Sequence, residues 1–326
     1  MKAVLCKRFG PPDTLVVDDV PEPGCGPRNV RIRVHAAGVN FPDTLIIEGK
    51  YQLRPEPPFS PGAEVAGIVD AVGAEVTGLS PGDRVMALMG WGGFAEVVEV
   101  DAGRVQPIPE RMDFLTAAGF AMTYGTSIHA LRQRGRLAPG ETLLVLGAGG
   151  GVGLAAVELG RVMGATVIAA ASTPEKLDAA RTTGATHLIN TREESLRERL
   201  KAITGGRGVD VVYDPVGGDL FDEALRSLAW KGRLLVVGFA SGRIPQAPAN
   251  LPLLKGSEIV GVYWGAFRQH EPEENRRNFR DLFAWHTAGQ LHPYIDRVLP
   301  LDQAAAALNA LRDRAVTGKI VLAVRD

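Results

Sequence analysis

The residues with the clearest chemistry lie in the segment 144–158, which reads LVLGAGGGVGLAAVE. An apolar strand runs into a glycine-rich turn that opens an apolar helix, and the turn has the spacing of a dinucleotide fingerprint with Ala in the first glycine position. Small residues there let backbone amides approach a pyrophosphate, whose charge the helix dipole stabilises. The expected cofactor loop is Ala148, Gly149, Gly150, Gly151, Val152 and Gly153.

The end of the next predicted strand, 166–171, indicates which dinucleotide is favoured. An NAD enzyme needs a carboxylate there for the ribose 2′-hydroxyl, and this chain has Ser172 instead. Thr173 and Lys176 follow, and Arg192 comes just after the third strand. A hydroxyl, a helix start and two cations are therefore available for a 2′-phosphate, and these residues favour NADP over NAD.

Strand-sized and helix-sized segments alternate around the cofactor loop. The buried strand candidates are 142–147, 166–171, 186–190, 209–214 and 233–239. Between them, 152–164 has apolar side chains at a helical period, and 172–184 has a Ser/Thr cap, proline in its first turn and glycine at its exit. This succession predicts a doubly wound parallel sheet, that is, a Rossmann α/β domain.

The first third of the chain has a different pattern. Short alternating apolar runs, such as 30–39 and 64–73, are separated by Gly and Pro turns, which suits an antiparallel β-barrel or sandwich. The tail is expected to contain helices at 275–288 and 302–313, with a turn around LHPYID between them, and a closing strand KIVLAV. From the pattern alone, the tail can belong to either domain.

Composition limits the function classes. Lys and Arg number 36 and Asp and Glu 37, so the net charge, 36 − 37, is −1 and nucleic acid is a poor candidate for the main partner. The two cysteines, Cys6 and Cys25, exclude a disulfide scaffold and a four-cysteine zinc lobe. The first residues contain no apolar run of signal-peptide length, and polar residues interrupt the longest uncharged stretch, 114–131. We therefore expect a cytoplasmic protein with no membrane span.

Several motifs in a fixed order resemble the zinc-independent NADPH:quinone oxidoreductase branch of the medium-chain dehydrogenase/reductase superfamily. They are AAGVNFPD (36–43), PFSPGAEVAGIV (58–69), LSPGDRV (79–85), GGFAEVV (92–98), MTYGTSIHAL (122–131), GAGGGVG (147–153), YDPVGG (213–218), VVGFASG (236–242) and TGKIVL (317–322). The resemblance implies a GroES-like β-barrel catalytic domain over 1–125, rejoined by 266–326, and a Rossmann nucleotide-binding domain over 126–265. It also implies an active site in the cleft between the two lobes.

The resemblance also bears on metal chemistry. Where the zinc alcohol dehydrogenases of this superfamily have a cysteine, the chain has Asn40, and where they have Gly-His-Glu it has Gly62, Ala63 and Glu64. The six histidines show no ligand-like pairing, and His129 is interpreted as a packed histidine. We therefore expect metal-free chemistry, which favours an acceptor that delocalises negative charge after receiving hydride.

The resemblance suggests roles for further residues. The catalytic candidates are Asn40, as a hydrogen-bonding group near the nicotinamide ribose or substrate carbonyl, Asp43, to orient Asn40 or relay a proton, and Tyr51, as a hydroxyl donor. From the sequence alone, Asn40 could equally well be a loop-capping amide, and Tyr51 could equally well be a packed aromatic residue.

The cofactor-binding candidates are Asn40 and Thr126 on the nicotinamide side, Ser172, Lys176 and Arg192 at the adenosine phosphate, Phe239 and Ser241 at the nicotinamide edge, Val262 and Trp264 at the end of the cleft, and Arg314 or Lys319 at a phosphate. Relatives often carry Tyr where this chain has Thr191, which leaves Lys176 and Arg192 with more of the adenosine side.

The implied reaction is NADPH-dependent hydride transfer to a quinone. An NADPH-dependent reductase of α,β-unsaturated carbonyls or enoyl thioesters is the second hypothesis, and a non-catalytic NADPH- or RNA-binding protein is the third. The segment 258–265 is apolar enough to be an edge strand that pairs in a homodimer, although a strand buried within one chain would look the same.

Overall fold

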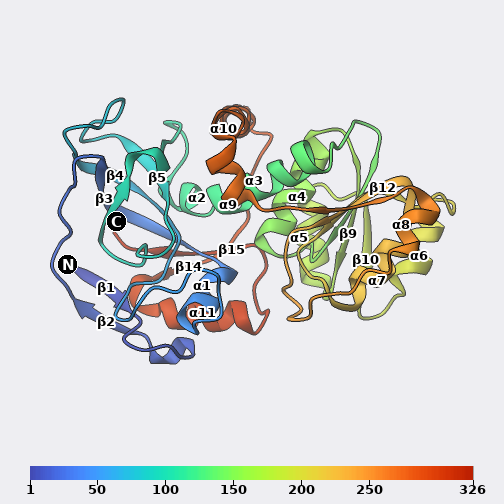
Figure 1. Cartoon of the computed structure of the whole chain (residues 1–326), viewed down its shortest axis with the longest axis horizontal. Coiled ribbons are helices and arrows are strands. Elements are labelled where there is room, and N and C mark those ends of the chain that lie inside the picture. Colours follow the sequence, from blue (N-terminus) through green and yellow to red (C-terminus); the bar gives the residue numbers. More distant parts are fainter. Residues whose placement is uncertain (326) are drawn as a thin grey trace. The chain divides into compact units, whose positions relative to one another are not determined.

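The computed structural model describes residues 1–325 and divides the chain into two compact units (Figure 1). Unit 1 contains Met1–Met122 and the segment from Ile295 onward, and unit 2 contains Thr123–Tyr294. No helix within residues 1–325 combines the length and the apolar character needed to cross a bilayer.

The strands are β1 (Lys2–Leu5), β2 (Val16–Asp19), β3 (Asn29–Val39), β4 (Glu64–Val72), β5 (Arg84–Leu88), β6 (Val97–Asp101), β7 (Val105–Pro107), β8 (Thr142–Leu146), β9 (Thr166–Ala171), β10 (His187–Asn190), β11 (Val209–Asp214), β12 (Leu228–Val236), β13 (Glu258–Gly261), β14 (Ile295–Pro300) and β15 (Lys319–Ala323). The α-helices are α1 (Phe41–Ile47), α2 (Phe114–Ala118), α3 (Ala121–Ile128), α4 (Gly151–Val162), α5 (Pro174–Thr183), α6 (Leu196–Ile203), α7 (Gly218–Arg226), α8 (Asn250–Lys255), α9 (Trp264–His270), α10 (Pro272–Thr287) and α11 (Ala304–Arg312).

Unit 1 is built on a mostly antiparallel sheet in the order β14-β15-β3-β4-β5-β7, with β6 also paired to β3. Alternation along β3 explains its packing, because Val30, Ile32 and Val34 are fully buried in the core. Arg31 and Arg33 point to the other face, and the Nε atom of each donates to a carboxylate oxygen of Asp70, at 2.6 and 2.7 Å. The ion pairs with Asp70 provide hydrogen-bond partners for the arginines on the outer face, while the inner face of β3 belongs to the same apolar core as Ala304, Ala307 and Leu308 of α11.

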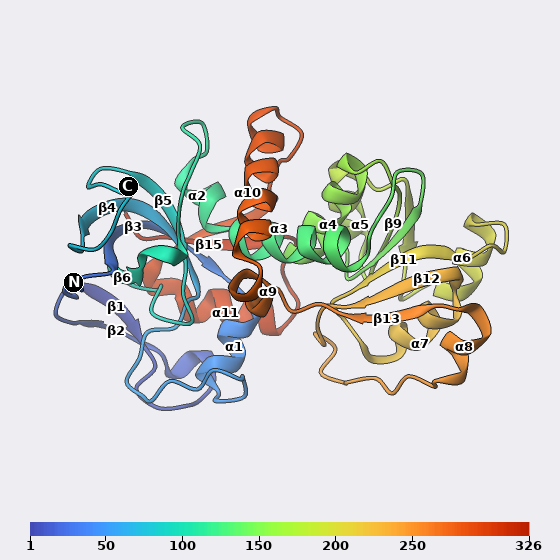
Figure 2. The ribbon, with the colours of Figure 1, turned by 45° about the horizontal axis from the view of Figure 1, so that its top comes forward.

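Unit 2 contains a six-stranded parallel sheet in the order β10-β9-β8-β11-β12-β13. The strand order reverses between β8 and β11, which is the arrangement of a doubly wound Rossmann domain. Figure 2 shows α4 and α5 on one side of this sheet and α7 and α8 on the other. The predicted doubly wound sheet is confirmed, and β9 and β11 have the bounds that the sequence predicted.

The division of the chain differs from the expected boundaries, because α9 and α10 belong to unit 2. The indole Nε1 of Trp264 donates to Asn275 Oδ1 at 2.9 Å within this helical pair. Arg132, which follows α3, donates to Asn278 and Asp281 of α10 at 3.0 and 2.8 Å. The contacts of Arg132 hold α10 to the rest of unit 2, and the chain returns to unit 1 only at β14.

Two predicted segments differ in the structure. The strand expected over 258–265 ends at Gly261, since Trp264 begins α9. The turn expected around LHPYID leads directly into β14, which pairs in parallel with β15. The polar sequence of β14, IDRVLP, hides this strand from a search for apolar alternation.

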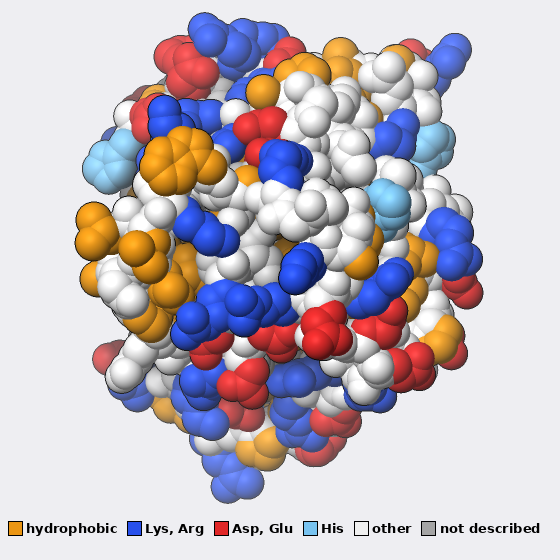
Figure 3. Space-filling model, turned by 90° about the vertical axis from the view of Figure 1, so that its right-hand side faces the viewer, with side chains coloured by type: hydrophobic (Ala, Val, Ile, Leu, Met, Phe, Trp, Pro, Cys, Tyr) orange, Lys and Arg blue, Asp and Glu red, His pale blue; other side chains and the backbone are white. Residues whose placement is uncertain are grey.

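β13 is the edge strand of the parallel sheet in the described chain. Large apolar side chains are exposed near it, including Trp230 (70% exposed), Leu253, Leu254 and Ile259. Figure 3 faces this end of unit 2 and shows hydrophobic side chains gathered along the left of that face. An unpaired strand edge beside apolar side chains can pair with another strand.

Candidate functional site

The turn between β8 and α4 requires glycine at two positions. Gly147 has φ +58°, a left-handed conformation that favours glycine. A Cβ on Gly153 would lie 2.3 Å from the carbonyl oxygen of Gly147, so a side chain there would push the first turn of α4 away from the end of β8. The third glycine of the fingerprint therefore has the predicted task of close packing between helix and strand.

The N-terminus of α4 fits a pyrophosphate. Its N-cap is Gly150, which has no side chain to cap the first-turn amides. The nearest atom to a Cβ built on Gly150 is the Gly147 carbonyl oxygen, at 3.5 Å, so the backbone is open to a ligand on this side. Uncapped amides at a positive helix end bind anions, which is what a dinucleotide needs here.

The residues predicted for the 2′-phosphate lie beside this loop. Ser172 is half-buried directly after β9, and α5 begins at Pro174 with Thr173 as its N-cap. The stem of Lys176 lies over the cofactor loop, because a Cβ on Gly149 would be 2.5 Å from Lys176 Cβ. The structure thus brings Ser172, Lys176 and the glycine turn together.

The other adenosine-side residues follow β10. Arg192 is exposed, and its backbone amide donates to Asn190 Oδ1 at 3.1 Å. The backbone amide and the hydroxyl of Thr191 both donate to the carbonyl oxygen of Ala171, at 2.9 and 3.3 Å. Thr191 therefore attaches the β10 loop to the end of β9, and the binding role of Arg192 stays a prediction.

Two loops meet at the carboxyl ends of β11 and β12, where parallel sheets bind ligands. The carboxylate of Asp214 accepts the backbone amides of Val216 and Gly217, both at 2.8 Å, which fixes the loop after β11. Ser241 donates its amide to the Val216 carbonyl at 2.9 Å, and Phe239 is 38% exposed. Phe239 and Ser241 therefore lie at this edge of the sheet, and their predicted contact with the nicotinamide stays a prediction.

The neighbouring strand end carries Val262 and Trp264. Val262 donates its amide to the carbonyl of Val236, which continues the pairing of β13 with β12 for one residue. Trp264 is 5% exposed, and a Cβ on Gly125 would lie 2.4 Å from its ring. Because Trp264 is packed and its indole N–H is bonded to Asn275, it serves the fold of α9 in this structure rather than an open binding surface.

Thr126 is half-buried on α3, and its neighbours attach α3 to the cofactor helix α4. Tyr124 donates its hydroxyl to Glu158 Oε2 at 2.6 Å, and Ser127 donates to the carbonyl of Val152 at 3.0 Å. Glu158 Oε1 also accepts the backbone amide of His292 at 2.8 Å. Burial raises the pKa of the Glu158 carboxyl. Sequence reasoning missed Glu158, although a single carboxylate within the apolar helical segment 152–164 is a signal that could have identified it.

His129 is a packed histidine, as interpreted from the sequence. It opens the π-helical turn His129–Arg134, and its ring stacks on Phe267 at a centroid distance of 3.9 Å. Burial lowers the pKa of His129 to about 4, so the ring is neutral at physiological pH.

The polar centre of unit 1 is a buried cluster around Asn40. Asn40, which is 6% exposed, follows β3 and opens α1. The Lys319 ammonium donates to Asn40 Oδ1 at 2.7 Å, to the Val39 carbonyl at 3.0 Å and to Glu64 Oε2 at 3.2 Å. Asn40 Nδ2 donates to the same Glu64 oxygen at 3.1 Å, and Glu64 Oε1 accepts the Met122 amide at 2.8 Å.

This cluster changes the interpretation of Lys319. Its three donors are taken by oxygen atoms of unit 1, and the residue is only 6% exposed. An ammonium has three N–H groups, so in this structure Lys319 has none left for a phosphate. Arg314 is exposed on the turn after α11. Sequence reasoning missed Glu64 as part of the site, because it named this residue only in the comparison with the Gly-His-Glu zinc motif, from which the chain differs at Ala63.

Asp43 is completely buried beside Asn40. Its Oδ2 accepts the backbone amide of Asn40 at 2.8 Å, which is one arm of a capping box at the start of α1. Its Oδ1 has no hydrogen-bond partner among the described residues. Burial raises the pKa of Asp43 to about 7, and Glu64 adds to the rise, while the amides of Asn40 and Gly62 and the charge of Lys319 oppose it.

Tyr51 is half-buried and packs against the apolar core of unit 1. It follows α1 by four residues, in the loop after the helix that Asn40 and Asp43 open. The aromatic body of Tyr51 thus has a packing role, and its predicted role as a hydroxyl donor stays a prediction.

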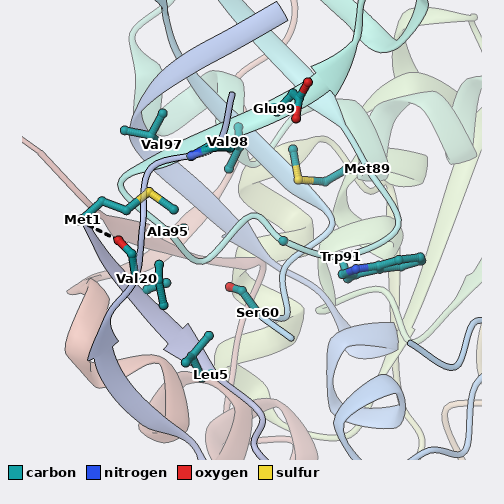
Figure 4. Close-up of a pocket in the computed structure, with 13 residues that line it drawn as sticks. Met1, Leu5, Val20, Ser60, Met89, Trp91, Ala95, Val97, Val98 and Glu99 are labelled. Carbon is teal, nitrogen blue, oxygen red and sulfur yellow. Dashed lines mark hydrogen bonds between the residues drawn. The ribbon is translucent and has the colours of Figure 1, made fainter. Parts of the chain in front are cut away.

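A surface pocket of about 340 Å³ lies elsewhere in unit 1 (Figure 4). Its lining is mainly apolar and includes Met1, Val20, Met89 and Trp91. The one carboxylate in the lining, Glu99, already accepts from Asn29 Nδ2 at 2.8 Å. The pocket therefore offers apolar contact but no group placed for acid–base chemistry.

The described residues contain no group of three or more His, Cys, Asp or Glu side chains arranged to hold a metal ion. By the resemblance described above, Asn40 and Ala63 occupy the positions where the zinc alcohol dehydrogenases have a cysteine and a histidine. Glu64 is bonded to Lys319 and Asn40 instead.

Two family models match the chain. Residues 26–110 match the alcohol dehydrogenase GroES-like domain, and residues 151–282 match the zinc-binding dehydrogenase domain. With the sheet orders described above, these matches confirm the GroES-like and Rossmann fold classes that the sequence predicted.

The chain is also similar to named proteins along almost its full length. It is 42% identical to a quinone oxidoreductase-like protein 2 homolog of Nematostella vectensis, over 98% of this chain and 88% of the relative. It is 33% identical to human quinone oxidoreductase, over 99% and 97%. The structure of Escherichia coli quinone oxidoreductase complexed with NADPH matches with a TM-score of 0.93 at 30% identity, over 99% of this chain and 100% of that chain. A probable oxidoreductase from Mycobacterium abscessus matches with a TM-score of 0.91 at 39% identity, over 99% of both chains.

The raised pKa of Asp43 predicts how stability depends on pH. The carboxyl keeps its proton up to about pH 7 in the folded chain but loses it near the ordinary value of 3.8 when unfolded. Its contribution to stability is therefore complete below the unfolded pKa and is lost as the pH rises through about 7. From about pH 5 to about pH 8, this loss amounts to about 3 kcal/mol.

Asp43→Asn is neutral at every pH, so it lacks this loss. Urea denaturation of both proteins across that pH range measures the free energy of unfolding. The wild type should lose stability relative to the variant as the pH rises, whereas a constant difference would show that Asp43 titrates normally in the folded chain.

Proposed function

The chain belongs to the quinone oxidoreductase branch of the medium-chain dehydrogenase/reductase superfamily, and on that basis we propose that it transfers hydride from NADPH to a quinone. As a member of this branch the protein is an oxidoreductase. The observation that carries the proposal is the open, uncapped N-terminus of α4, with Lys176 lying over the glycine turn.

The residues of unit 2 fit NADPH. The first-turn amides of α4 would bind the pyrophosphate. Ser172 and Lys176 would bind the 2′-phosphate, because Ser172, and not a carboxylate, occupies the position directly after β9 where a 2′-hydroxyl would be selected. The similar Escherichia coli enzyme is complexed with NADPH, which supports this assignment. Bound NADPH supplies the hydride. Phe239, Ser241 and Val262, at the carboxyl edge of the sheet, would position the reacting end of the cofactor.

A quinone suits a site that works by orientation and hydrogen bonding. Hydride addition to a quinone gives a hydroquinone anion, whose charge the ring delocalises, and one proton then completes the hydroquinone. Such a product does not need a Lewis acid, whereas an alkoxide does. The residue types at Asn40 and Ala63, which are not zinc ligands here, support a metal-independent reaction.

We assign the proton chemistry to unit 1. Asp43 has a pKa of about 7, so it can hold a proton near neutral pH and release one at little cost. The backbone amide of Asn40 donates to Asp43 Oδ2, so a change in the protonation of Asp43 acts directly on Asn40. Tyr51 is the proposed hydroxyl donor to the substrate oxygen.

We also propose that two copies of the chain pair through β13. This strand has an unpaired edge in the described sheet, and exposed Trp230, Leu253 and Leu254 lie on neighbouring elements. A twofold axis would bring the same edge of each copy together and cover apolar surface on both.

The proposed reaction predicts a substrate profile. Purified protein with NADPH should oxidise the cofactor when offered ortho- or para-quinones, as measured by the loss of nicotinamide absorbance. Protein treated with a chelator, and shown by elemental analysis to be free of metal, should oxidise NADPH at the same rate. Turnover of enals or enoyl thioesters with inert quinones would contradict the quinone assignment, and stoichiometric zinc lost together with activity would contradict metal independence.

Lys176→Ala tests the cofactor assignment. Loss of one charge-assisted hydrogen bond to the 2′-phosphate should raise the KM for NADPH about 10- to 100-fold. The KM for NADH, which lacks this phosphate, should change little. Lys201→Ala, on the exposed face of α6, is the matched control and should leave both values unchanged. Equal effects on both cofactors in Lys176→Ala would remove Lys176 from the 2′-phosphate site.

A further inference from the structure

We infer that Lys319 and Glu64 are positioning residues that fix the orientation of the Asn40 amide and bias the protonation of Asp43 in opposite directions. The inference rests on the proposed function only for the roles of Asn40 and Asp43 in the reaction. Neither Lys319 nor Glu64 is assigned contact with substrate, and both act through neighbours within unit 1.

Strand register brings these residues together from distant parts of the sequence. β3 lies between β15 and β4, with Ile320 opposite Val39 and Glu64 opposite Gly38. Lys319 and Glu64 therefore approach the end of β3 from its two sides, at the point where Asn40 begins α1. Their side chains are 8% and 0% exposed, so solvent screens this ion pair little.

The hydrogen bonds allow only one orientation of the Asn40 amide. An ammonium only donates, so the oxygen of the amide must face Lys319, and an ionised carboxylate only accepts, so the nitrogen must face Glu64. Both N–H groups of Asn40 are then used, by Glu64 at 3.1 Å and by the Gly38 carbonyl at 3.3 Å. Asn40 therefore has no N–H left in this structure to donate to a quinone carbonyl, and its oxygen already accepts from Lys319.

Burial is the main cause of the raised pKa of Asp43, and the same two charges act on this carboxyl in opposite directions. The positive charge of Lys319, from β15, favours the ionised carboxylate, and the negative charge of Glu64, from β4, favours the protonated acid. The other groups that face Asp43 are the backbone amides of Asn40 and Gly62. Because the pair is neutral as a whole, removing one member exposes Asp43 to the uncompensated charge of the other.

The test uses Lys319→Met, Glu64→Gln and the double variant, with Lys7→Met as the matched control. Lys7 is an exposed lysine of unit 1 paired with Asp18, so its loss removes the same charge where water screens it. The titration of the Asp43 carboxyl is followed by infrared difference spectroscopy on the full chain, with Asp43→Asn identifying the band. This readout does not depend on activity.

We expect Lys319→Met to raise the pKa of Asp43 and Glu64→Gln to lower it, each by about one unit. The double variant should titrate close to the wild type, and Lys7→Met should titrate with the wild type. Shifts of both single variants in the same direction, or no shift in either, would overturn the inference. If burial of an unpaired charge prevents a single variant from folding, the charge-balanced double variant remains the measure. A double variant displaced from the wild type by a unit or more would overturn the inference.

The pH profile of kcat/KM separates this inference from the proposed function. If protonated Asp43 serves the reaction, the fall in kcat/KM at high pH should move up in Lys319→Met and down in Glu64→Gln. Infrared shifts without matching shifts in the profile would leave the inference standing and remove Asp43 from the proposed mechanism. Infrared titrations that do not move would overturn the inference whatever the activity shows.

Discussion

The contact between the Gly147 carbonyl and Gly153 is the constraint on which the cofactor domain depends. A Cβ on Gly153 would lie 2.3 Å from that oxygen, so only glycine lets α4 begin directly against the end of β8. This close start leaves the first amides of α4 uncapped and places them beside the end of β9. The position of the proposed anion site, and the nearness of the residues proposed to select the dinucleotide, both depend on the backbone turn between β8 and α4.

Unit 1 depends on a different kind of interaction, the buried pair of Lys319 and Glu64. Removing two charges from water is costly, and the pair is tolerable only because other groups complete the hydrogen bonds of both. The Val39 carbonyl and Asn40 Oδ1 serve Lys319, while Asn40 Nδ2 and the Met122 amide serve Glu64. This hydrogen-bonding network offsets the cost of burying the two charges, and it also fixes the orientation of the Asn40 amide.

Local patterns in the sequence predicted the parts of the fold that local physics controls. The apolar runs of β9 and β11 gave their observed bounds, and α5 has the proline start and the Gly184 exit, with φ +123°, that its sequence indicates. β14 was missed because pairing with β15, and not its own polar sequence, makes it a strand. The same reason hides the Asn40 cluster, since Lys319 and Glu64 are 255 residues apart in the chain. Their approach follows from sheet register, which no local pattern contains.

The proposed reaction is direct hydride transfer from NADPH held at the glycine turn to a quinone. Its most direct test is a single turnover in which protein preloaded with NADPH is mixed rapidly with a quinone and the nicotinamide absorbance is followed. Because the C4–H bond breaks in this step, NADPH that carries deuterium at both C4 positions should be oxidised more slowly than ordinary NADPH. Equal rates with the two cofactors, or no oxidation by any quinone, would contradict the account.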